Sequence, residues 1–428
     1  MGNFGTAPGA LHEGVIVTDT SKSHADHGLR VLHVLRGCYL PRDPNADAIS
    51  GLVRAVLEIS AAQSRLGHHV TVTIDSDAPW ESEWSGVRLK GLRRARRAHF
   101  RAAGRSVDLS AHAPLIIESW RRHYDVVHAH SVGYLRWVRA GVRVIHFHSD
   151  PKFTGPRAEG YQLDARDLEA IARFSDVRVA VSQFVADELD SIRPGLARPR
   201  VVRNGVNTPA AQSPADRALL RRAWGAGSDD SVFLYAGMVA PFKGIPELLQ
   251  AFARLSATDA RSRLVIAGSE NLWGRDRRLG APSGLEHELQ RFADTPSASG
   301  RVTFLGFVPA AIMPAIYAAC DAVVVPSTWR EGFGLVALEA MAASRPVIAS
   351  HIGGLPEVVT PDCGVLVPPG DVGALSAAMR LVAQDRDLRR RLGSRGADLA
   401  RRWSWDETAR ALSDIYSTAP RRSVRRQS

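Results

Sequence analysis

The sequence predicts an α/β protein built from two doubly wound domains. Its 428 residues correspond to about two domains at roughly 100–200 residues each. Short apolar runs rich in valine and isoleucine alternate with amphipathic stretches through both halves, which is typical of parallel sheets covered by helices. This alternation breaks at residues 207–230, where Pro, Ala, Ser and Asp dominate. One doubly wound domain is therefore expected on each side of the break.

The elements follow in order along the chain. The strands predicted in the first half are 30–35, 69–74, 125–130, 142–148, 177–182 and 200–203, with helices at 51–66 and 183–192. The strands predicted in the second half are 231–236, 263–267, 301–305, 322–325, 346–350 and 364–367, with helices at 246–255, 310–320 and 335–343. A last amphipathic stretch, 405–416, follows the final strand and needs a surface to pack against. Ligands of such sheets bind beyond the carboxyl ends of the strands.

Composition excludes several classes of protein. Hydrophobic residues make up 45% and charged residues 23%, as in ordinary globular proteins and unlike disordered or collagen-like chains. The longest apolar runs fall short of the ~18 residues of a membrane-spanning helix. The three cysteines, Cys38, Cys320 and Cys363, lie far apart, which argues against a disulfide framework. No secretory signal is visible, so a cytoplasmic and, from the arginine-rich composition, bacterial protein is expected.

The net charge of +11 raises the question of anionic partners. Basic clusters stand at 93–97 and 421–426, without the interleaved aromatic residues of a single-strand platform, so nucleic acid is not expected. A solvated basic surface is the favoured interpretation. The alternative is peripheral attraction to an anionic membrane or to an anionic substrate.

Lysine usage singles out Lys243. Four of the 55 basic residues are lysines, and Lys243 is the one in the second half. It follows the predicted strand 231–236 in a loop that opens with Gly237, which lets a ligand approach the backbone. A compact ammonium there can reach a phosphate. The loop lacks the Walker pattern, and a surface lysine is the alternative interpretation.

A second loop, after strand 322–325, combines glycines and carboxylates. Gly332, Phe333 and Gly334 precede a helix, whose free N–H groups favour an anion. Glu339 lies in this otherwise apolar helix and needs a donor such as a ligand hydroxyl. Glu331 can face the same ligand. We favour a sugar-diphosphate site over a helix cap with carboxylates paired to protein.

Histidines end two strands of the first half. Alternation places His128 with His130, and His146 with His148, on one face of each strand. Hydrogen-bonded core histidines and cleft residues remain equally supported. No H-E-x-x-H motif or cysteine ligand accompanies them, so no metal site is predicted.

Three motifs resemble those of the retaining glycosyltransferases of family 4. They are E-G-F-G-x-x-x-x-E-A-M at 331–341, P-V-I-A-S-x-x-G-G-L-P-E-V-V at 346–359 and G-x-L-V-P-P-G-D at 364–371. The likeness covers about 30–416 and implies the GT-B fold, two Rossmann-like domains facing across a cleft. It also implies a hexosyltransferase that uses a nucleotide sugar, with a UDP-sugar favoured over a GDP-sugar.

The resemblance also assigns the site. It implies that Glu331 contacts the hydroxyls of the donor sugar, Glu339 those of the ribose, and Lys243 the phosphates. The implied catalytic residues are His130, Lys243 and Glu331, and the implied acceptor-side residues are Gly51, His128 and His148. The implied donor-binding residues are Gly237, Lys243, Gly306, Phe307, Val308, Glu331, Gly332, Phe333, Gly334, Leu335 and Glu339.

The resemblance further implies an organisation and a mechanism. The expected units are a flexible segment 1–29, an acceptor-side domain 30–206, a linker 207–230, a nucleotide-sugar-binding domain 231–401, a closing helix 402–418 and a basic tail 419–428. The expected acceptor is a small molecule, a lipid-linked sugar or a glycan. Transfer is expected by front-face attack without a divalent metal or another cofactor. The alternatives are a sugar phosphorylase or synthase of this fold, and a catalytically weak nucleotide-sugar-binding protein.

The sequence departs from the family pattern in three places, one of which is Asn207 where an aspartate is usual. Met238 stands where the family usually has an arginine beside the phosphates. The loop 38–50 lacks the paired glycines that usually lie close to the donor.

Overall fold

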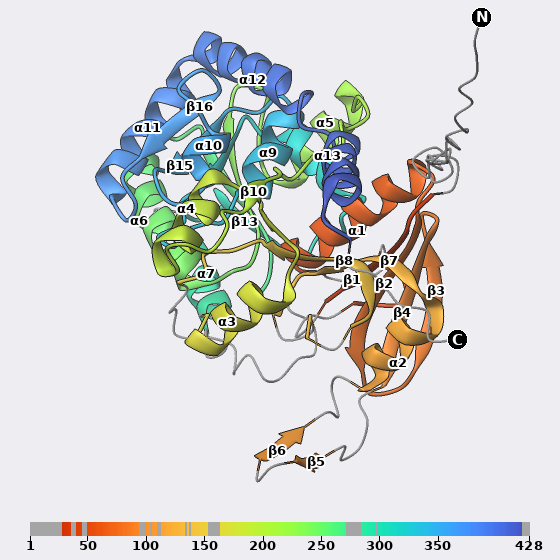
Figure 1. The fold of residues 1–428 in the computed structure, drawn as a ribbon. Helices are drawn as coiled ribbons and strands as arrows, with labels where there is room; N and C mark the ends of the chain where they lie inside the picture. Colours follow the sequence, from red (N-terminus) through yellow and green to blue (C-terminus); the bar gives the residue numbers. More distant parts are fainter. Residues whose placement is uncertain are drawn as a thin grey trace, which may run out of the picture.

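The computed structural model describes residues 28–421, except 36–39, 45–48, 94–98, 103–104, 109–112, 133–134, 137, 153–162, 271–283 and 296–297. The predicted flexible segment up to residue 27, most of the 93–97 cluster, Cys38 and the tail from 422 lie outside the described residues. Two sheets lie in two bodies side by side, with helices around each (Figure 1). The prediction of two doubly wound α/β domains is confirmed.

The first domain is built on an eight-stranded sheet in the order β10-β9-β8-β7-β1-β2-β4-β3. Its strands are β1 (Arg30–Val34), β2 (His69–Ser76), β3 (Trp80–Trp84), β4 (Val87–Arg93), β7 (Tyr124–Ala129), β8 (Ala140–Phe147), β9 (Val177–Ala180) and β10 (Arg200–Val201). All neighbouring pairs are parallel except β3 with β4. The chain runs outward from β1 in one direction and from β7 in the other, so the topological switch point lies between β1 and β7.

The second domain has a parallel six-stranded sheet in the order β13-β12-β11-β14-β15-β16. Its strands are β11 (Ser231–Ala236), β12 (Ser262–Ala267), β13 (Val302–Gly306), β14 (Ala322–Val325), β15 (Val347–Ser350) and β16 (Gly364–Val367). Both β11 and β14 are buried along their whole length, as expected of continuous apolar strands. The switch point here lies between β11 and β14.

Helices cover both sheets. They are α1 (Gly51–Arg65), α2 (Ala113–Arg122), α3 (Ala165–Phe174), α4 (Gln183–Ile192), α5 (Pro214–Ala223), α6 (Ile245–Ser256), α7 (Leu285–Ala293), α8 (Met313–Ala319), α9 (Leu335–Ala342), α10 (Leu355–Val358), α11 (Val372–Gln384), α12 (Arg386–Ala400) and α13 (Trp405–Thr418). Within the described residues, none of these helices has the length and apolar composition needed to cross a bilayer. Serine N-caps begin both α1 and α13, at Ser50 and Ser404, each contributing about 1 kcal/mol.

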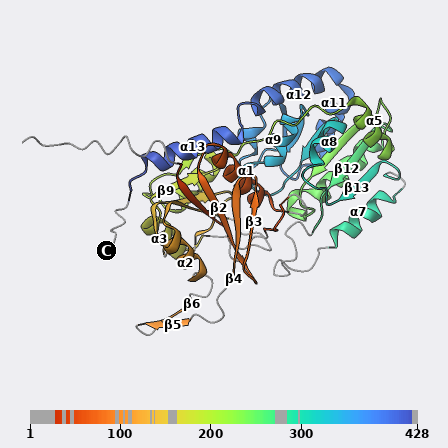
Figure 2. The same ribbon diagram turned by 90° about the vertical axis from the view of Figure 1, so that its right-hand side faces the viewer.

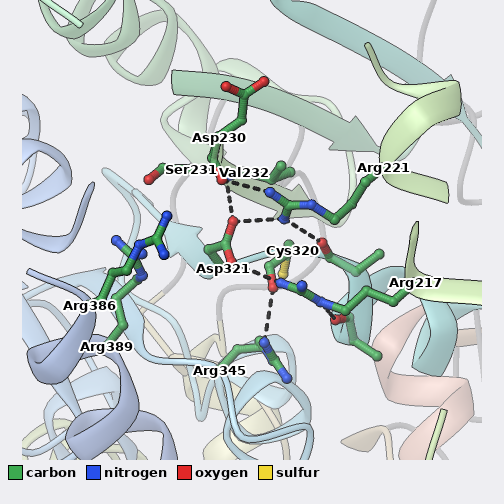
Figure 3. Close-up of polar contacts among 12 residues, drawn as sticks. Arg217, Arg221, Asp230, Ser231, Val232, Cys320, Asp321, Arg345, Arg386 and Arg389 are labelled. Carbon is green, nitrogen blue, oxygen red and sulfur yellow. Dashed lines mark hydrogen bonds and ion pairs between the residues drawn. The ribbon is translucent and has the colours of Figure 1, made fainter. Parts of the chain in front are cut away.

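Several elements have no counterpart in the predicted pattern. Helix α5 lies within the stretch 207–230, and Ser213 caps it. Arginines of α5 bind Asp321, which precedes β14: Arg217 at 2.9 Å and Arg221 at 2.8 Å (Figure 3). The backbone N–H of Val232 donates to the same carboxylate. These ion pairs attach α5 to the second domain.

A two-stranded hairpin was also absent from the predicted pattern. It consists of β5 (His99–Ala102) and β6 (Arg105–Asp108) and projects away from the body of the first domain in both views (Figures 1 and 2).

The last helix, α13, returns to the first domain and lies along α1 (Figures 1 and 2). Trp405 and Tyr416 are buried in the core of the first domain. The Tyr416 hydroxyl accepts a hydrogen bond of 2.9 Å from the Gln63 side chain of α1. Apolar burial and a polar contact together fix α13 against the first domain.

Candidate active site

The two sheets meet at their carboxyl ends. The loop after β14 packs against the loop after β8, and a Cβ atom on Gly332 would lie 2.3 Å from the carbonyl oxygen of His148. The hydroxyl of Ser182 donates to the Gly332 carbonyl at 2.6 Å. Gly332 is therefore required by the contact between the domains. From the sequence we had assigned it only to an anion-binding turn before a helix.

Charged side chains also join the domains beside this contact. Arg330 forms an ion pair of 3.3 Å with buried Asp150 and a second pair with Glu188. Glu357, on α10, accepts hydrogen bonds from the first N–H groups of α4, those of Gln183 and Phe184. Sequence reasoning missed these residues, because partners so far apart in the chain leave no local pattern.

An interdomain cavity of about 320 Å³ lies between the domains. A volume of this size matches small-molecule sites in proteins. Its lining residues are Ile49, Gly51, Arg54, Glu58, Gly205, Val206, Asn207, Pro209, Ala236, Gly237, Ala267, Gly268, Phe307, Val308, Ala310, Met313, Pro314, Tyr317, Leu335, Val336, Glu339, Ala343 and Trp405. Six residues named from the sequence meet here: Gly51, Gly237, Phe307, Val308, Leu335 and Glu339.

The N-terminus of α9 opens into this cavity. Gly334 precedes the helix with a left-handed φ of 103°, and no side chain caps the helix. The first N–H groups of an α-helix have no partner within the helix, so those at Leu335 and Val336 are available to an anion. Phe333 is buried, at 3% exposed, and its ring lies 6.0 Å from that of Trp403. Phe333 therefore anchors the turn.

Glu339 lies one turn into α9 and lines the cavity. The hydroxyl of Tyr317 donates to its Oε2 at 2.8 Å. Burial raises the pKa of Glu339, and the Tyr317 hydrogen bond and the charge of Arg54 only partly oppose it. Arg54, in the first turn of α1, also lines the cavity. Sequence reasoning named neither Tyr317 nor Arg54, although a cation three residues after Gly51 was a usable signal.

Lys243 and Glu331 bind each other. The ammonium Nζ lies 2.6 Å from Glu331 Oε1, which also accepts a hydrogen bond of 2.7 Å from Ser327. Burial alone would raise the pKa of Glu331, but the Lys243 charge and these hydrogen bonds together lower it. The family resemblance implied that the two residues contact different parts of a donor. The structure places them in one ion pair beside the switch point of the second sheet.

The loop after β11 brings its backbone close to the next strand. Gly237 has a φ of 138°, and a Cβ on neighbouring Gly268 would lie 1.7 Å from the Gly237 carbonyl oxygen. The Met238 carbonyl accepts a hydrogen bond of 2.5 Å from Tyr235. At the end of β13, Gly306 has a φ of 64°, and Phe307 is 39% exposed.

The first domain contains a histidine cluster, defined here as His33, His128, His130, His146 and His148. His128 and His146 are at most 1% exposed, His130 is 8% exposed and His148 is half-buried. His130 Nε2 lies 2.9 Å from His33 Nδ1, and His130 Nδ1 lies 2.8 Å from His148 Nε2. Each of the two interpretations left open by the sequence thus holds for some of the histidines. His128 and His146 are core residues, whereas His148 lies at the contact between the domains.

Burial keeps this cluster neutral. It lowers the pKa of His33 to about 4 and that of His148 to about 3, and those of the other three lie well below the usual 6.5. His33 was missed from the sequence. Its signal was one polar side chain inside the buried strand Arg30–Val34, and parallel pairing places it beside His128.

Comparison with known proteins places the chain in a family. Residues 216–398 match the family described as glycosyl transferases group 1, and residues 49–209 match glycosyltransferase family 4. A D-inositol 3-phosphate glycosyltransferase from Nocardioides is 34% identical over 69% of this chain and 68% of its own. One from Geodermatophilus obscurus is 31% identical over 88% of this chain and 86% of its own.

Solved structures show the same architecture. Anabaena HepE in complex with UDP and glucose aligns with a TM-score of 0.70 at 21% identity, over 91% of this chain and all of the other. Sucrose-phosphate synthase from Thermosynechococcus elongatus aligns with a TM-score of 0.72 at 25% identity, over 91% and 98%. The GT-B fold is thereby confirmed, and the chain belongs to the family 4 glycosyltransferases and is an enzyme of that class.

Proposed function

We propose that this glycosyltransferase moves a sugar from a nucleotide-sugar donor, with a UDP-sugar favoured, to a hydroxyl of a small-molecule acceptor. The observation that carries the proposal is the uncapped N-terminus of α9 opening into the interdomain cavity, with Lys243 and Glu331 beside the same switch point. A helix N-terminus and an ammonium are suited to a diphosphate. Anabaena HepE, which shares this fold, was solved with UDP and glucose and with UDP-glucose.

Each part of the donor is assigned to residues that line the cavity or lie close to them in the chain, except Lys243, Glu331 and His130, which are not among the lining residues. The diphosphate is assigned to the N–H groups of Phe333, Gly334 and Leu335, and to Lys243. The ribose is assigned to Glu339, whose carboxylate can accept from hydroxyls. The remaining assignments are the base to the backbone of Gly306, Phe307 and Val308, and the transferred sugar to Glu331, Gly332, Gly237 and His130.

Donor binding is proposed to rearrange the Lys243–Glu331 pair. As long as Lys243 Nζ stays 2.6 Å from Glu331 Oε1, the carboxylate offsets the positive charge of the ammonium. A diphosphate competes for the ammonium, and sugar hydroxyls can then donate to the released Glu331 oxygen. The pair thus keeps the Glu331 carboxylate ionised before the donor arrives.

The proposed chemistry is retention by front-face attack. Negative charge develops on the leaving diphosphate, and preorganised donors stabilise it there. On this proposal the α9 N-terminus and Lys243 supply that stabilisation without a divalent metal on the phosphates. The leaving phosphate accepts the proton of the attacking hydroxyl, so no carboxylate nucleophile is assigned. Closure of the two domains completes the site.

The acceptor is proposed to be a polyol or polyol phosphate. The support is that the two curated relatives are named as inositol 3-phosphate glycosyltransferases. Arg54 and Gly51 of the first domain line the cavity opposite Leu335 and Glu339, so a cation is present for an acceptor phosphate. Gly51 and His148 remain the acceptor-side residues of this proposal, whereas His128, which the resemblance also assigned to the acceptor side, is buried in the core.

The test is a matrix of donors and acceptors. The purified chain is incubated with UDP-, GDP- or ADP-sugars and with inositol 3-phosphate, inositol or water, and the products are identified by mass spectrometry. We expect a glycosylated inositol phosphate with a UDP-sugar and an α-linkage from an α-linked donor. Products formed from sugar 1-phosphate without nucleotide would identify a phosphorylase. Nucleotide binding without turnover on any acceptor would contradict the proposal.

A further inference from the structure

Two neighbouring residues in the loop after β14 face different domains. Glu331, proposed to bind the transferred sugar, points to Lys243 of its own domain, with 2.6 Å between Nζ and Oε1. Arg330, the residue before it, binds two carboxylates of the first domain. Whatever holds Arg330 therefore acts on the loop that carries Glu331.

The first domain contacts Arg330 through three side chains. Its Nε lies 3.3 Å from Asp150 Oδ2, and a terminal nitrogen binds Glu188. The guanidinium carbon lies 4.7 Å from the centre of the Phe184 ring, within the range of a cation–π contact. A planar guanidinium with several donors can bind two carboxylates and stack on a ring at once, whereas an ammonium is a point charge.

Asp150 depends on this cation. Its side chain is 3% exposed, and the backbone N–H of Lys152 donates to its Oδ1 at 2.9 Å. Among the described residues, Arg330 is the one cation paired with Asp150, whereas Glu188 also pairs with Lys152 at 2.8 Å. A buried carboxylate that loses its partner is strongly destabilising. Separation of Arg330 from Asp150 is therefore unfavourable, and the loop is held against the first domain.

The backbone of Glu331 is packed tightly between the two domains. Its carbonyl oxygen accepts a hydrogen bond of 2.7 Å from the N–H of Gly354. A Cβ atom on Gly353 would lie 2.4 Å from the same oxygen, and one on Gly332 would lie 2.3 Å from the His148 carbonyl oxygen of the first domain. Because the backbone has no room to adjust on its own, the direction of the Glu331 side chain follows the position of the loop.

The carboxylate assigned to the ribose is held differently. Glu339 receives its hydrogen bond of 2.8 Å from Tyr317, which belongs to the same domain. We propose, on the basis of the function proposed above, that Arg330 is a positioning residue. It makes recognition of the transferred sugar, and not of the nucleotide, depend on the contact between the two domains.

An asymmetry between donor and product follows. A UDP-sugar binds best to the arrangement in which Arg330 contacts Asp150 and Glu331 is in place, so it favours that arrangement. UDP alone makes no contact with Glu331 on this proposal. A ligand with equal affinity for two arrangements does not shift the equilibrium between them, so UDP leaves the domain contact unchanged.

The test measures the affinities of the full-length chain for UDP and UDP-glucose by calorimetry. Arg330→Met keeps an unbranched stem beside Phe184 and removes the charge. We expect its affinity for UDP-glucose to fall about 10–100-fold, as in Glu331→Ala, because a hydrogen bond to a charged group is lost in both variants. Its affinity for UDP should be unchanged. Arg386→Ala, which breaks an exposed ion pair with Asp229, is the matched control and should change neither affinity.

A double variant separates positioning from stability. Arg330→Met alone leaves Asp150 buried without its cation and should lower the midpoint of urea unfolding, whereas adding Asp150→Asn removes that charge and should restore the midpoint. UDP-glucose affinity should stay low in the double variant, which carries the test if Arg330→Met does not fold. Arg330→Lys, which keeps a charge for Asp150, should recover part of the affinity. Affinity that returns together with stability would overturn the proposal.

Glu331→Ala distinguishes this inference from the proposed function. If Glu331→Ala loses UDP-glucose affinity and Arg330→Met does not, the inference is wrong and the sugar assignment stands. If neither variant loses affinity, the sugar assignment fails and the inference fails with it. Hydrogen exchange without donor tests the loop directly: the Gly354 amide, bonded to Glu331, should exchange faster in Arg330→Met, and the amides of β12 should not. Unchanged protection of Gly354 would show that Arg330 does not hold the loop.

Discussion

The two switch points of this molecule use opposite chemistry. In the first sheet, buried histidines kept neutral by desolvation contact one another, Gln63 and Tyr416. In the second sheet, a charged pair, Lys243 and Glu331, stands beside an uncapped helix N-terminus. The same topology thus supports a closed, neutral network in one domain and an open, charged site in the other.

This difference separates two roles. A diphosphate needs fixed positive charge, and in this pair of sites the second domain provides it. The first domain offers hydrogen-bonding side chains without net charge, which suits positioning of a neutral group. Substitutions in the charged site should therefore change catalysis and nucleotide affinity, whereas those of Gln63 and Tyr416 in the neutral network should change stability.

The largest effect is expected from Lys243→Ala. If the ammonium stabilises the leaving diphosphate, its loss should cost about 2.7–4 kcal/mol in the barrier and lower kcat more than it raises KM. Steady-state kinetics measure both. Lys90→Ala is the control, because Lys90 also forms a lysine–glutamate pair, with Glu118 at 2.7 Å, but in the first domain. An unchanged kcat and an unchanged affinity for UDP in Lys243→Ala would remove this residue from the site.

Replacing the two glutamates one at a time should show which part of the donor each of them binds. Glu339→Ala should weaken binding of UDP itself, because ribose is common to donor and product. Glu331→Ala should spare UDP and weaken only the UDP-sugar. Each lost charge-assisted hydrogen bond is worth about 1.5–3 kcal/mol, which calorimetry resolves. Equal losses of UDP affinity in both variants would contradict this division.

The neutral network is tested by Tyr416→Phe. The hydroxyl contacts Gln63 at 2.9 Å and His128 at 2.5 Å, and its removal leaves buried polar groups unsatisfied at a cost of about 1–3 kcal/mol. Urea unfolding should show this loss, while calorimetry with UDP should show wild-type affinity. If the variant keeps its full stability but loses UDP affinity, the network serves nucleotide binding rather than stability, and the proposed difference between the two switch points is wrong.

The smallest effect concerns pH. Burial raises the pKa of Glu339, so its carboxylate takes up a proton at a higher pH in the folded protein than in the unfolded chain. The pKa of Glu331 is lowered, so the Lys243 pair contributes stability above pH 4.5 and loses it as the pH falls through the folded value. UDP affinity should therefore decline on acidification before the ion pair breaks. Calorimetry at a series of pH values checks this order, and Glu339→Gln should remove the early decline.

Features formed by residues close together in the chain could be predicted from the sequence, and features formed by distant residues could not. The second sheet was predicted well because Ser231–Ala236 and Ala322–Val325 are continuous apolar runs, and the glycines and Glu339 belong to one segment. Family membership followed from the same local motifs. The Lys243–Glu331 pair was not predicted, because its members are 88 residues apart and each was assigned to a ligand.

The first domain shows the same limit more strongly. His33 was one polar residue in an apolar strand, and only the pairing of β1 with β7 gives it meaning. Tyr416 was expected in the closing helix, but nothing in the sequence indicated that it and Gln63 orient His128 and His33. Helix α5 escaped notice because the packing of arginines on Asp321, rather than an apolar face, holds it in place.

The contact between Gln63 and Tyr416 joins residues 353 positions apart. Domains generally fold as they emerge from the ribosome. The first domain emerges long before α13 is synthesised. The apolar face of α1 that later meets Trp405 and Tyr416 then stays open to water while the whole second domain is made. The first domain therefore reaches its final structure last, and a chain that stops before residue 405 would contain a complete second domain beside an unfinished first one.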